Sequence, residues 1–261
     1  MLALDQDPEA IAVAHTLFHD DPRCHAIQSK FSELSSLLKA EGKQRQVDGL
    51  LLDLGVSSPQ LDTAERGFSF QQDGPLDMRM DNNQGPTAAD WLTQVDETEL
   101  VRVLREYGEA RYARRIARTI LHQQTEQPIT RTQQLAGLVT RSIPQREQHK
   151  HPATRTFQAI RIALNNELTA LHQILQDIQT ILAPGGRLVV ISFHSLEDRL
   201  VKHTIRRQTQ GPRLPKSVPV QGLQTQGNLR LIGKPIRPGA AEIQANPRAR
   251  SAIMRVAEVI R

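Results

Sequence analysis

The sequence predicts an α/β fold in which buried, parallel strands are joined by helices, with an all-helical segment inserted into the sheet-forming part. The apolar run Leu50–Leu52, which ends at Asp53, is typical of a strand buried on both faces. Leu2–Asp5 and residues 187–193 are two further strand candidates, each followed by a helix start. Between residues 86 and 164 the sequence changes to polar and helical. A sheet with one helical insertion follows from these three observations.

The N-terminal residues predict a strand followed by a helix. Leu2–Asp5 resembles the end of a buried strand, and Asp7 and Pro8 suit the N-cap and the first helical position. In nucleotide-binding folds an acidic residue at such a strand end accepts hydrogen bonds from a ribose diol. Asp5 is therefore a candidate nucleoside contact, and a strand-end cap is the alternative interpretation.

Two elements precede the central strand. Residues 23–27 are a weak strand candidate, and Ser32–Ala40 is predicted to be a helix. Phe31 comes just before this helix, where a hydrophobic staple is one interpretation of its ring. The strand Val47–Asp53 then brings Asp53 to the edge where ligands bind in open α/β sheets.

A long loop follows Asp53, and loops of this length are usually binding or active-site loops. It carries the aromatic residues Phe68 and Phe70 beside Arg66 and several carboxylates. A carboxylate delivered into an aromatic-bearing loop suits a planar substrate with an amine. From the residues alone, Asp53 as a turn cap and both rings as core anchors are equally good interpretations.

The helical part carries arginines on one predicted face. Their spacing by three, one and three residues places all four on the same side of a helix: Arg111, Arg114, Arg115 and Arg118. A stripe of positively charged side chains suits contacts to RNA phosphates, although a solvated helix face is the usual explanation. With Arg155 and Arg161 further along, the segment is predicted to hold a nucleic acid.

The last third of the chain predicts a return to the sheet. Residues 157–182 have a helical apolar face, broken near Asn165 and Asn166, and Pro184-Gly185-Gly186 is expected to stop it. After the strand at 187–193, residues 211–247 are expected to form a surface connection with a short strand at 229–232. Residues 251–260 are predicted to be a final strand at the far side of the sheet.

Composition excludes several classes of protein. The 261 residues carry a net charge of +5, which is compatible with a polyanionic partner. A single cysteine excludes an intramolecular disulfide, and the nine histidines show no metal-ligand spacing, so no metal is expected. No apolar run approaches the length of a membrane span, and we expect a cytoplasmic protein. His194, Ser195 and Asp198 lack the nucleophile-elbow pattern and are not interpreted as a hydrolase triad.

Several long segments resemble the ribosomal small-subunit methyltransferase H family. They are LLLDLGVSSPQLD at 50–62, ERGFSF at 65–70, DGPLDMRMD at 73–81, HPATRTFQAIRI at 151–162, APGGRL at 183–188, ISFHSLEDR at 191–199 and NPRARS at 246–251. The resemblance implies a class I, Rossmann-like methyltransferase sheet from residues 1–85 and 165–261, with residues 86–164 as an inserted helical substrate-binding domain. It also implies methyl transfer from S-adenosylmethionine to the exocyclic N4 of a cytosine in the decoding region of 16S rRNA or the small ribosomal subunit.

The resemblance also implies roles for individual residues. Asp5 is assigned to the cofactor ribose, Phe31 to its adenine, and Asp53 and Gln60 to the same cofactor site. The target base must leave its stack, and Phe68 or Phe70 is expected to receive it. Asp53, or a backbone carbonyl of residues 54–58, is the candidate acceptor for the amine proton.

One part of the family pattern is missing from this sequence. The family carries a first strand and a Gly-rich cofactor loop upstream of the residues that match Leu2–Asp5. Without them we expect unpaired neighbouring strands and no S-adenosylmethionine binding by this chain. A non-catalytic RNA-binding remnant is therefore the alternative function. A nicotinamide-dependent oxidoreductase would have the same kind of sheet with an acidic residue at a strand end, but residues 48–81 give this function no support.

Overall fold

The computed structural model describes residues 1–144, 151–210 and 227–260. The chain forms two compact units, which are described separately: residues 1–28 with 56–167, and residues 29–55 with 168–261. Residues 211–226 of the predicted surface connection lie outside the described residues.

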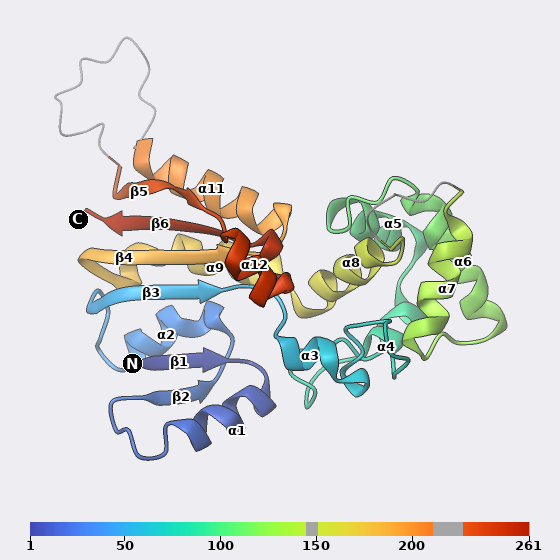
Figure 1. The fold of residues 1–261 in the computed structure, drawn as a ribbon, viewed down its shortest axis with the longest axis horizontal. Helices are drawn as coiled ribbons and strands as arrows, with labels where there is room; N and C mark the ends of the chain where they lie inside the picture. The colour runs from blue at the N-terminus through green and yellow to red at the C-terminus, as the bar shows by residue number, and fades with distance from the viewer. Residues whose placement is uncertain (145–150, 211–226, 261) are drawn as a thin grey trace, which may run out of the picture. The chain divides into compact units, whose positions relative to one another are not determined.

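The first unit begins with a small parallel sheet and continues with helices (Figure 1). Its elements are β1 (Leu2–Asp5), α1 (Pro8–Leu17), β2 (His25–Gln28), α3 (Ser58–Asp62), α4 (Ala88–Gln94), α5 (Glu97–Glu106), α6 (Ala113–Glu126), α7 (Thr132–Ser142) and α8 (Thr154–Asn165). Asp7 is the N-cap of α1, as predicted, because its side chain accepts a hydrogen bond from the backbone N–H of Glu9 at 3.0 Å. Helix α8 ends where Asn166 adopts a left-handed conformation, which confirms the predicted break.

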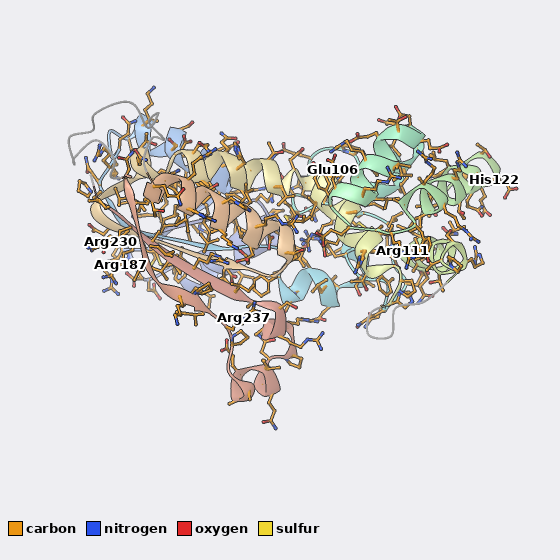
Figure 2. All side chains as sticks on the ribbon, turned by 90° about the horizontal axis from the view of Figure 1, so that it is seen from above. Glu106, Arg111, His122, Arg187, Arg230 and Arg237 are labelled. Atoms are coloured by element: carbon orange, nitrogen blue, oxygen red, sulfur yellow. The ribbon has the colours of Figure 1, made fainter. Side chains whose placement is uncertain are left out.

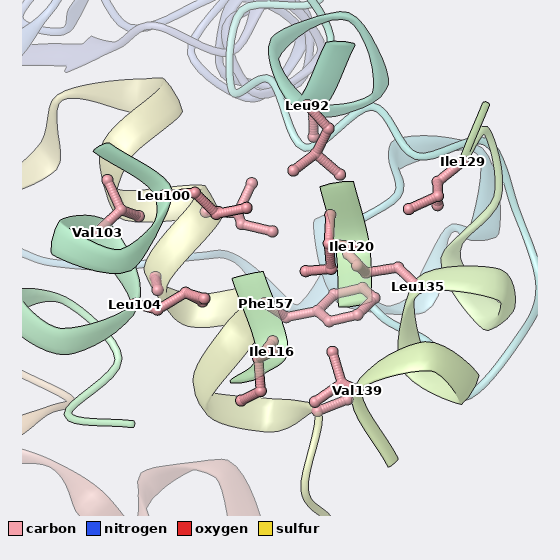
Figure 3. Close-up of a cluster of buried hydrophobic side chains, with 14 of the residues drawn as sticks. Leu92, Leu100, Val103, Leu104, Ile116, Ile120, Ile129, Leu135, Val139 and Phe157 are labelled. Atoms are coloured by element: carbon pink, nitrogen blue, oxygen red, sulfur yellow. The ribbon is translucent and has the colours of Figure 1, made fainter. Parts of the chain in front are cut away.

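Amphipathic helices α5 to α8 build the core of this unit (Figure 3). Leu100 and Leu104 of α5, Ile116 and Ile120 of α6, and Phe157 of α8 are buried together, as the helical spacing of their apolar faces requires. The helices also pack closely: a Cβ on Gly108 would lie 2.7 Å from the carbonyl oxygen of Arg155 at the start of α8. Figure 3 labels the side chains of Leu100, Leu104, Ile116, Ile120 and Phe157.

The boundary predicted at residue 86 does not separate the two units. Residues of the loop that follows the central strand belong to the same core as the helices: Phe68, Leu76, Met78 and Met80. Their side chains are at most 6% exposed. This apolar packing explains why residues 56–85 form one unit with the inserted helices.

The second unit holds a four-stranded sheet in the order β3-β4-β6-β5 (Figure 1). Its elements are η1 (Phe31–Glu33), α2 (Leu34–Ala40), β3 (Val47–Asp53), α9 (Glu167–Gln176), α10 (Ile178–Ile181), β4 (Leu182–Ser192), α11 (Ser195–Gln210), β5 (Leu229–Ile236), α12 (Ala240–Ala245), η4 (Pro247–Ser251) and β6 (Ile253–Val259). β3 and β4 are parallel, whereas β6 runs antiparallel to both β4 and β5.

Three details of the predicted sheet were wrong. β3 is not buried on both faces, because the side chain of Leu51 is 63% exposed. The unpaired strands agree with the sequence, since among the described residues β3 pairs only with β4, and β1 only with β2, so each keeps one unpaired edge. The far edge is formed by β5, and the final strand β6 is internal. β4 already begins at Leu182, so the Pro-Gly-Gly segment lies inside the strand, where the pairing with β3 shifts register.

Candidate active site

Asp5 lies at the carboxyl end of β1, where the sequence placed it. Its Oδ1 accepts a hydrogen bond from the backbone N–H of Asp7 at 2.9 Å, and its side chain remains exposed. Partial burial raises the pKa of the Asp5 carboxyl, and the nearby Asp7 carboxylate adds to the rise. The arrangement leaves an acceptor at the end of the strand that suits hydroxyl donors.

Behind Asp5 lies a buried ionic network centred on Asp7 and Arg66. Nη1 of Arg66 donates to Oδ2 of Asp7 at 2.7 Å, and the two side chains are 6% and 4% exposed. Nη2 of Arg66 donates to the backbone carbonyls of Arg79 and Met80 at 3.1 and 3.0 Å. The guanidinium thus joins Asp7, just after β1, to residues 79–80 of the long loop that also carries Arg66.

Gln60 belongs to the same network. Its Nε2 donates to Oδ2 of Asp7 at 2.7 Å, and its Oε1 accepts the backbone N–H of Ser57 at 3.0 Å. Ser57 in turn accepts the N–H of Gln60, so the two residues form the capping box that starts α3. Both ends of the Gln60 amide are engaged, which gives this side chain a role in fixing the loop.

The two loop phenylalanines have different environments. Phe68 is 6% exposed, lies in the core, and has the Arg66 guanidinium 5.8 Å from its ring centroid. It therefore has no free face for a substrate base, and the core-anchor interpretation holds for it. Phe70 is half-buried against Phe157, with ring centroids 4.9 Å apart, and lies 4.5 Å from the exposed His151 ring. Of the two rings, Phe70 is the one near the surface.

Asp53 ends β3 in the second unit, opposite Ile191 of β4. Its side chain is exposed, and Glu197 is nearby on α11. Partial burial raises the pKa of the Asp53 carboxyl, and the charge of Glu197 raises it further. A carboxylate whose proton affinity is increased in this way suits the role of a proton acceptor. Phe31, half-buried at the start of η1, lies in the same unit.

His194 and Glu197 cap helix α11. Nδ1 of His194 accepts the backbone N–H of Glu197 at 3.4 Å, while Oε2 of Glu197 accepts the N–H groups of Phe193 and His194 at 2.9 and 3.3 Å. This is a capping box with histidine in place of serine or threonine. Nε2 of His194 lies 3.1 Å from Oε1 of Glu197. Asp198 instead pairs with Arg255 at 2.7 Å, which agrees with the rejection of a hydrolase triad.

The predicted arginine surface is only partly available. Arg114 and Arg115 are exposed on α6, and Arg111 is exposed beside the ring of Tyr112. Arg118 is exposed but forms an ion pair with Glu97 at 3.0 Å.

The two arginines of α8 are less accessible than those of α6. Nη1 of Arg155 donates to the carbonyl of Glu109 at 2.7 Å. Arg161 is largely buried and binds Glu167 through two hydrogen bonds of 2.8 Å. Arg161 is therefore engaged within the protein, and we leave it out of the proposed RNA surface.

The network around Asp7 was not predicted from the sequence. Arg66 and Asp7 are far apart in the chain, and no local pattern connects them. Two local signals were present, however: Ser57 with Gln60, and His194 with Glu197, each have the spacing of a capping box. Of the four predicted cofactor residues, Asp5 and Gln60 lie in the first unit, and Phe31 and Asp53 in the second.

Comparison with known proteins identifies similar sequences over nearly the whole chain. The model of the MraW methylase family matches residues 1–260. A protein of Thioalkalivibrio sulfidiphilus (strain HL-EbGR7), named ribosomal RNA small subunit methyltransferase H, is 57% identical over 259 residues, which cover 99% of this chain and 82% of that relative. A protein of the same name from Idiomarina loihiensis (strain ATCC BAA-735 / DSM 15497 / L2-TR) is 54% identical over 263 residues, covering 100% of this chain and 83% of the relative. Among the described residues, no helix has the length and apolar character needed to cross a membrane.

Proposed function

Because the chain belongs to the MraW methylase family, we propose that it transfers a methyl group from S-adenosylmethionine to the exocyclic N4 of a cytosine in 16S rRNA. The observation that carries the chemical part of this proposal is Asp53 at the carboxyl end of β3, with its pKa raised by burial and by Glu197. The two relatives named as small-subunit rRNA methyltransferases support the choice of RNA substrate.

Individual residues have side chains whose chemistry suits the parts of a nucleoside cofactor. The exposed carboxylate of Asp5 at the end of β1 is suited to accept hydrogen bonds from ribose hydroxyls, and Phe31 offers a half-buried ring to a base. Gln60 would hold the loop through its capping box and its bond to Asp7. When bound, S-adenosylmethionine supplies an electrophilic methyl group, so no metal is needed for the transfer.

Asp53 would then act on the cytosine amine. The lone pair of that nitrogen is delocalised into the ring, and a hydrogen-bond acceptor helps to localise it and takes up the released proton. Holding the nitrogen in line with the methyl group contributes through orientation, which supplies up to about 7–11 kcal/mol in favourable cases. Phe70, near the surface beside His151, is the ring we assign to stacking on the extruded base.

Methyl transfer is tested with labelled S-adenosylmethionine and small ribosomal subunits, followed by nucleoside analysis of the RNA. Two proteins are compared: this chain, and a fusion that adds the segment of the Thioalkalivibrio relative that precedes its matched residues. We expect the fusion to form N4-methylcytidine and its Asp53→Ala variant to form none. A different methylated nucleoside would refute the assigned atom, and activity of the Asp53→Ala variant would refute the assigned acceptor.

Calorimetric titration of S-adenosylmethionine separates this function from the alternative. The alternative, an RNA-binding protein without catalysis, is favoured by the exposed arginines Arg114 and Arg115. We expect the fusion to bind the cofactor, and the chain by itself is titrated beside it. RNA binding by both proteins with cofactor binding by neither would favour the alternative.

A further inference from the structure

The connection between β5 and β6 is much longer than these strands require. The two strands are antiparallel neighbours, which a two-residue turn can join. Here residues 237–252 intervene and contain α12 and η4. Figure 2 shows this segment projecting from the sheet of its own unit, with Arg237 at its base.

Hydrophobic packing does not explain this excursion. Helix α12 buries none of its residues, and in η4 only Ala249 is buried, at 7% exposure. An ordered segment that buries almost no apolar surface gains little stability from its own contacts. The presence of this ordered segment therefore points to contact with another molecule.

The segment is basic, and we call residues 234–252 the basic arm. It carries four exposed cations, Lys234, Arg237, Arg248 and Arg250, against one acidic residue, Glu242. Within the described part of the chain, Lys234, Arg237 and Arg250 form no ion pair. The arginines of the neighbouring strands differ: Arg230 and Arg187 both lie against Glu258, at 2.6 and 3.8 Å. Figure 2 labels these two arginines together with Arg237.

The basic arm begins and ends at the same end of the strands as Asp53, the carboxyl end of β3 and β4. Ile253, the first residue of β6, pairs with Ser192 at the carboxyl end of β4, and Ile236 at the end of β5 pairs with Met254. Asp53 is the last residue of the parallel strand β3 and pairs with Ile191, so it lies at this same end of the strands. The root is fixed because Arg255 of β6 binds Asp198 of α11 through hydrogen bonds of 2.7 and 3.0 Å.

We propose that the basic arm binds the phosphates of the RNA strand that flanks the target nucleotide. Cations without partners inside the protein gain the most binding free energy from a polyanion. A projecting arm can also reach an RNA strand that lies across this end of the sheet. A membrane surface is disfavoured because α12 has a single large apolar residue, Ile243, and no apolar face to insert. The choice of RNA rests on the proposed function, and the arm is separate from the arginines of α6, which belong to the other unit.

The arm is tested by reversing two of its charges. The variant Arg237→Glu/Arg250→Glu is compared with Arg206→Glu/Arg207→Glu, which makes the same change in net charge at the end of α11. Those two arginines are also exposed, but they lie near the start of β5, whereas the basic arm follows the end of that strand. Binding of a fluorescent 16S rRNA fragment containing the decoding region is followed by anisotropy at several salt concentrations, and thermal unfolding verifies that each variant is folded.

We expect the arm variant to weaken RNA binding by about tenfold or more and to reduce the slope of log Kd against log salt by about 1 to 2. The control should change Kd by about twofold or less. Equal losses in both variants would mean that only net charge acts, and this would overturn the proposal, as would unchanged binding by the arm variant or no RNA binding by the parent chain. Loss of RNA binding by the arm variant in a protein that forms no N4-methylcytidine would support the arm and refute the proposed function.

Discussion

Replacing Arg66 by methionine should destabilise the first unit strongly. Methionine keeps much of the apolar stem but removes the guanidinium that binds Asp7 at 2.7 Å and the carbonyls of Arg79 and Met80. The Asp7 side chain is 4% exposed, so the substitution leaves a buried carboxylate without its cation. Breaking a buried pair in this way costs about 3–5 kcal/mol.

Urea unfolding followed by tryptophan fluorescence measures this cost directly. Trp91 is the only tryptophan and lies in α4 of the same unit as Arg66. Arg23→Met is the matched control, because Arg23 also pairs with an aspartate, Asp21, but its side chain is 86% exposed. We expect the control to unfold like the parent protein.

A second substitution tests the cause of the loss. Asn in place of Asp7 keeps one oxygen for the N-cap and removes the stranded charge, while its amide nitrogen takes the place of the oxygen that accepts from Gln60. The double variant Asp7→Asn/Arg66→Met should therefore be more stable than Arg66→Met. The reasoning fails if the double variant is no more stable, or if Arg66→Met alone lowers the free energy of unfolding by less than about 1 kcal/mol.

Three further substitutions test the site and its surroundings. Burial and Glu197 raise the pKa of Asp53 in the folded state, so ionised Asp53 opposes folding and stability falls as pH rises through that pKa. Asp53→Asn should flatten this dependence above about pH 4 while abolishing methyl transfer; an unchanged pH profile of unfolding would contradict the shift. Arg114→Glu/Arg115→Glu should weaken RNA binding and leave cofactor affinity unchanged in titrations of the fusion, and full RNA binding would remove α6 from the interface. Phe68→Ala should lower the free energy of unfolding by about 3–5 kcal/mol, because its ring is 6% exposed; a fully stable variant would contradict its place in the core.

Local signals in the sequence predicted the elements well. The strand Val47–Asp53, the N-cap at Asp7 and the break near Asn166 all depend on residues close together in the chain. The burial of β3 was not predictable in the same way, because an apolar run does not reveal which neighbours the strand finds. Leu51 is 63% exposed, so the face of β3 that carries it is not covered by the part of the chain that the structure describes.

The candidate site shows the same division. The positions of Asp53 and Asp5 at strand ends were predicted correctly, because a strand followed by a loop is a local pattern in the sequence. Phe68 and Phe70 are two residues apart in one loop, and only the packing of the whole core decides that Phe68 is buried and Phe70 is near the surface. The pair of Arg66 with Asp7 joins distant segments, so its recognition required the three-dimensional structure.

The division of the chain into two units affects how the protein can be dissected. The chain passes from one unit to the other between residues 28 and 29, 55 and 56, and 167 and 168. Neither unit is a continuous segment, so trimming the chain from its ends cannot isolate either one. A fragment of residues 56–167 would keep the helices and Arg66 but lose Asp7, the buried carboxylate that Arg66 binds. A self-sufficient first unit would require residues 1–28 to be rejoined to residue 56 through a designed linker, which makes this protein a natural subject for chain rearrangement.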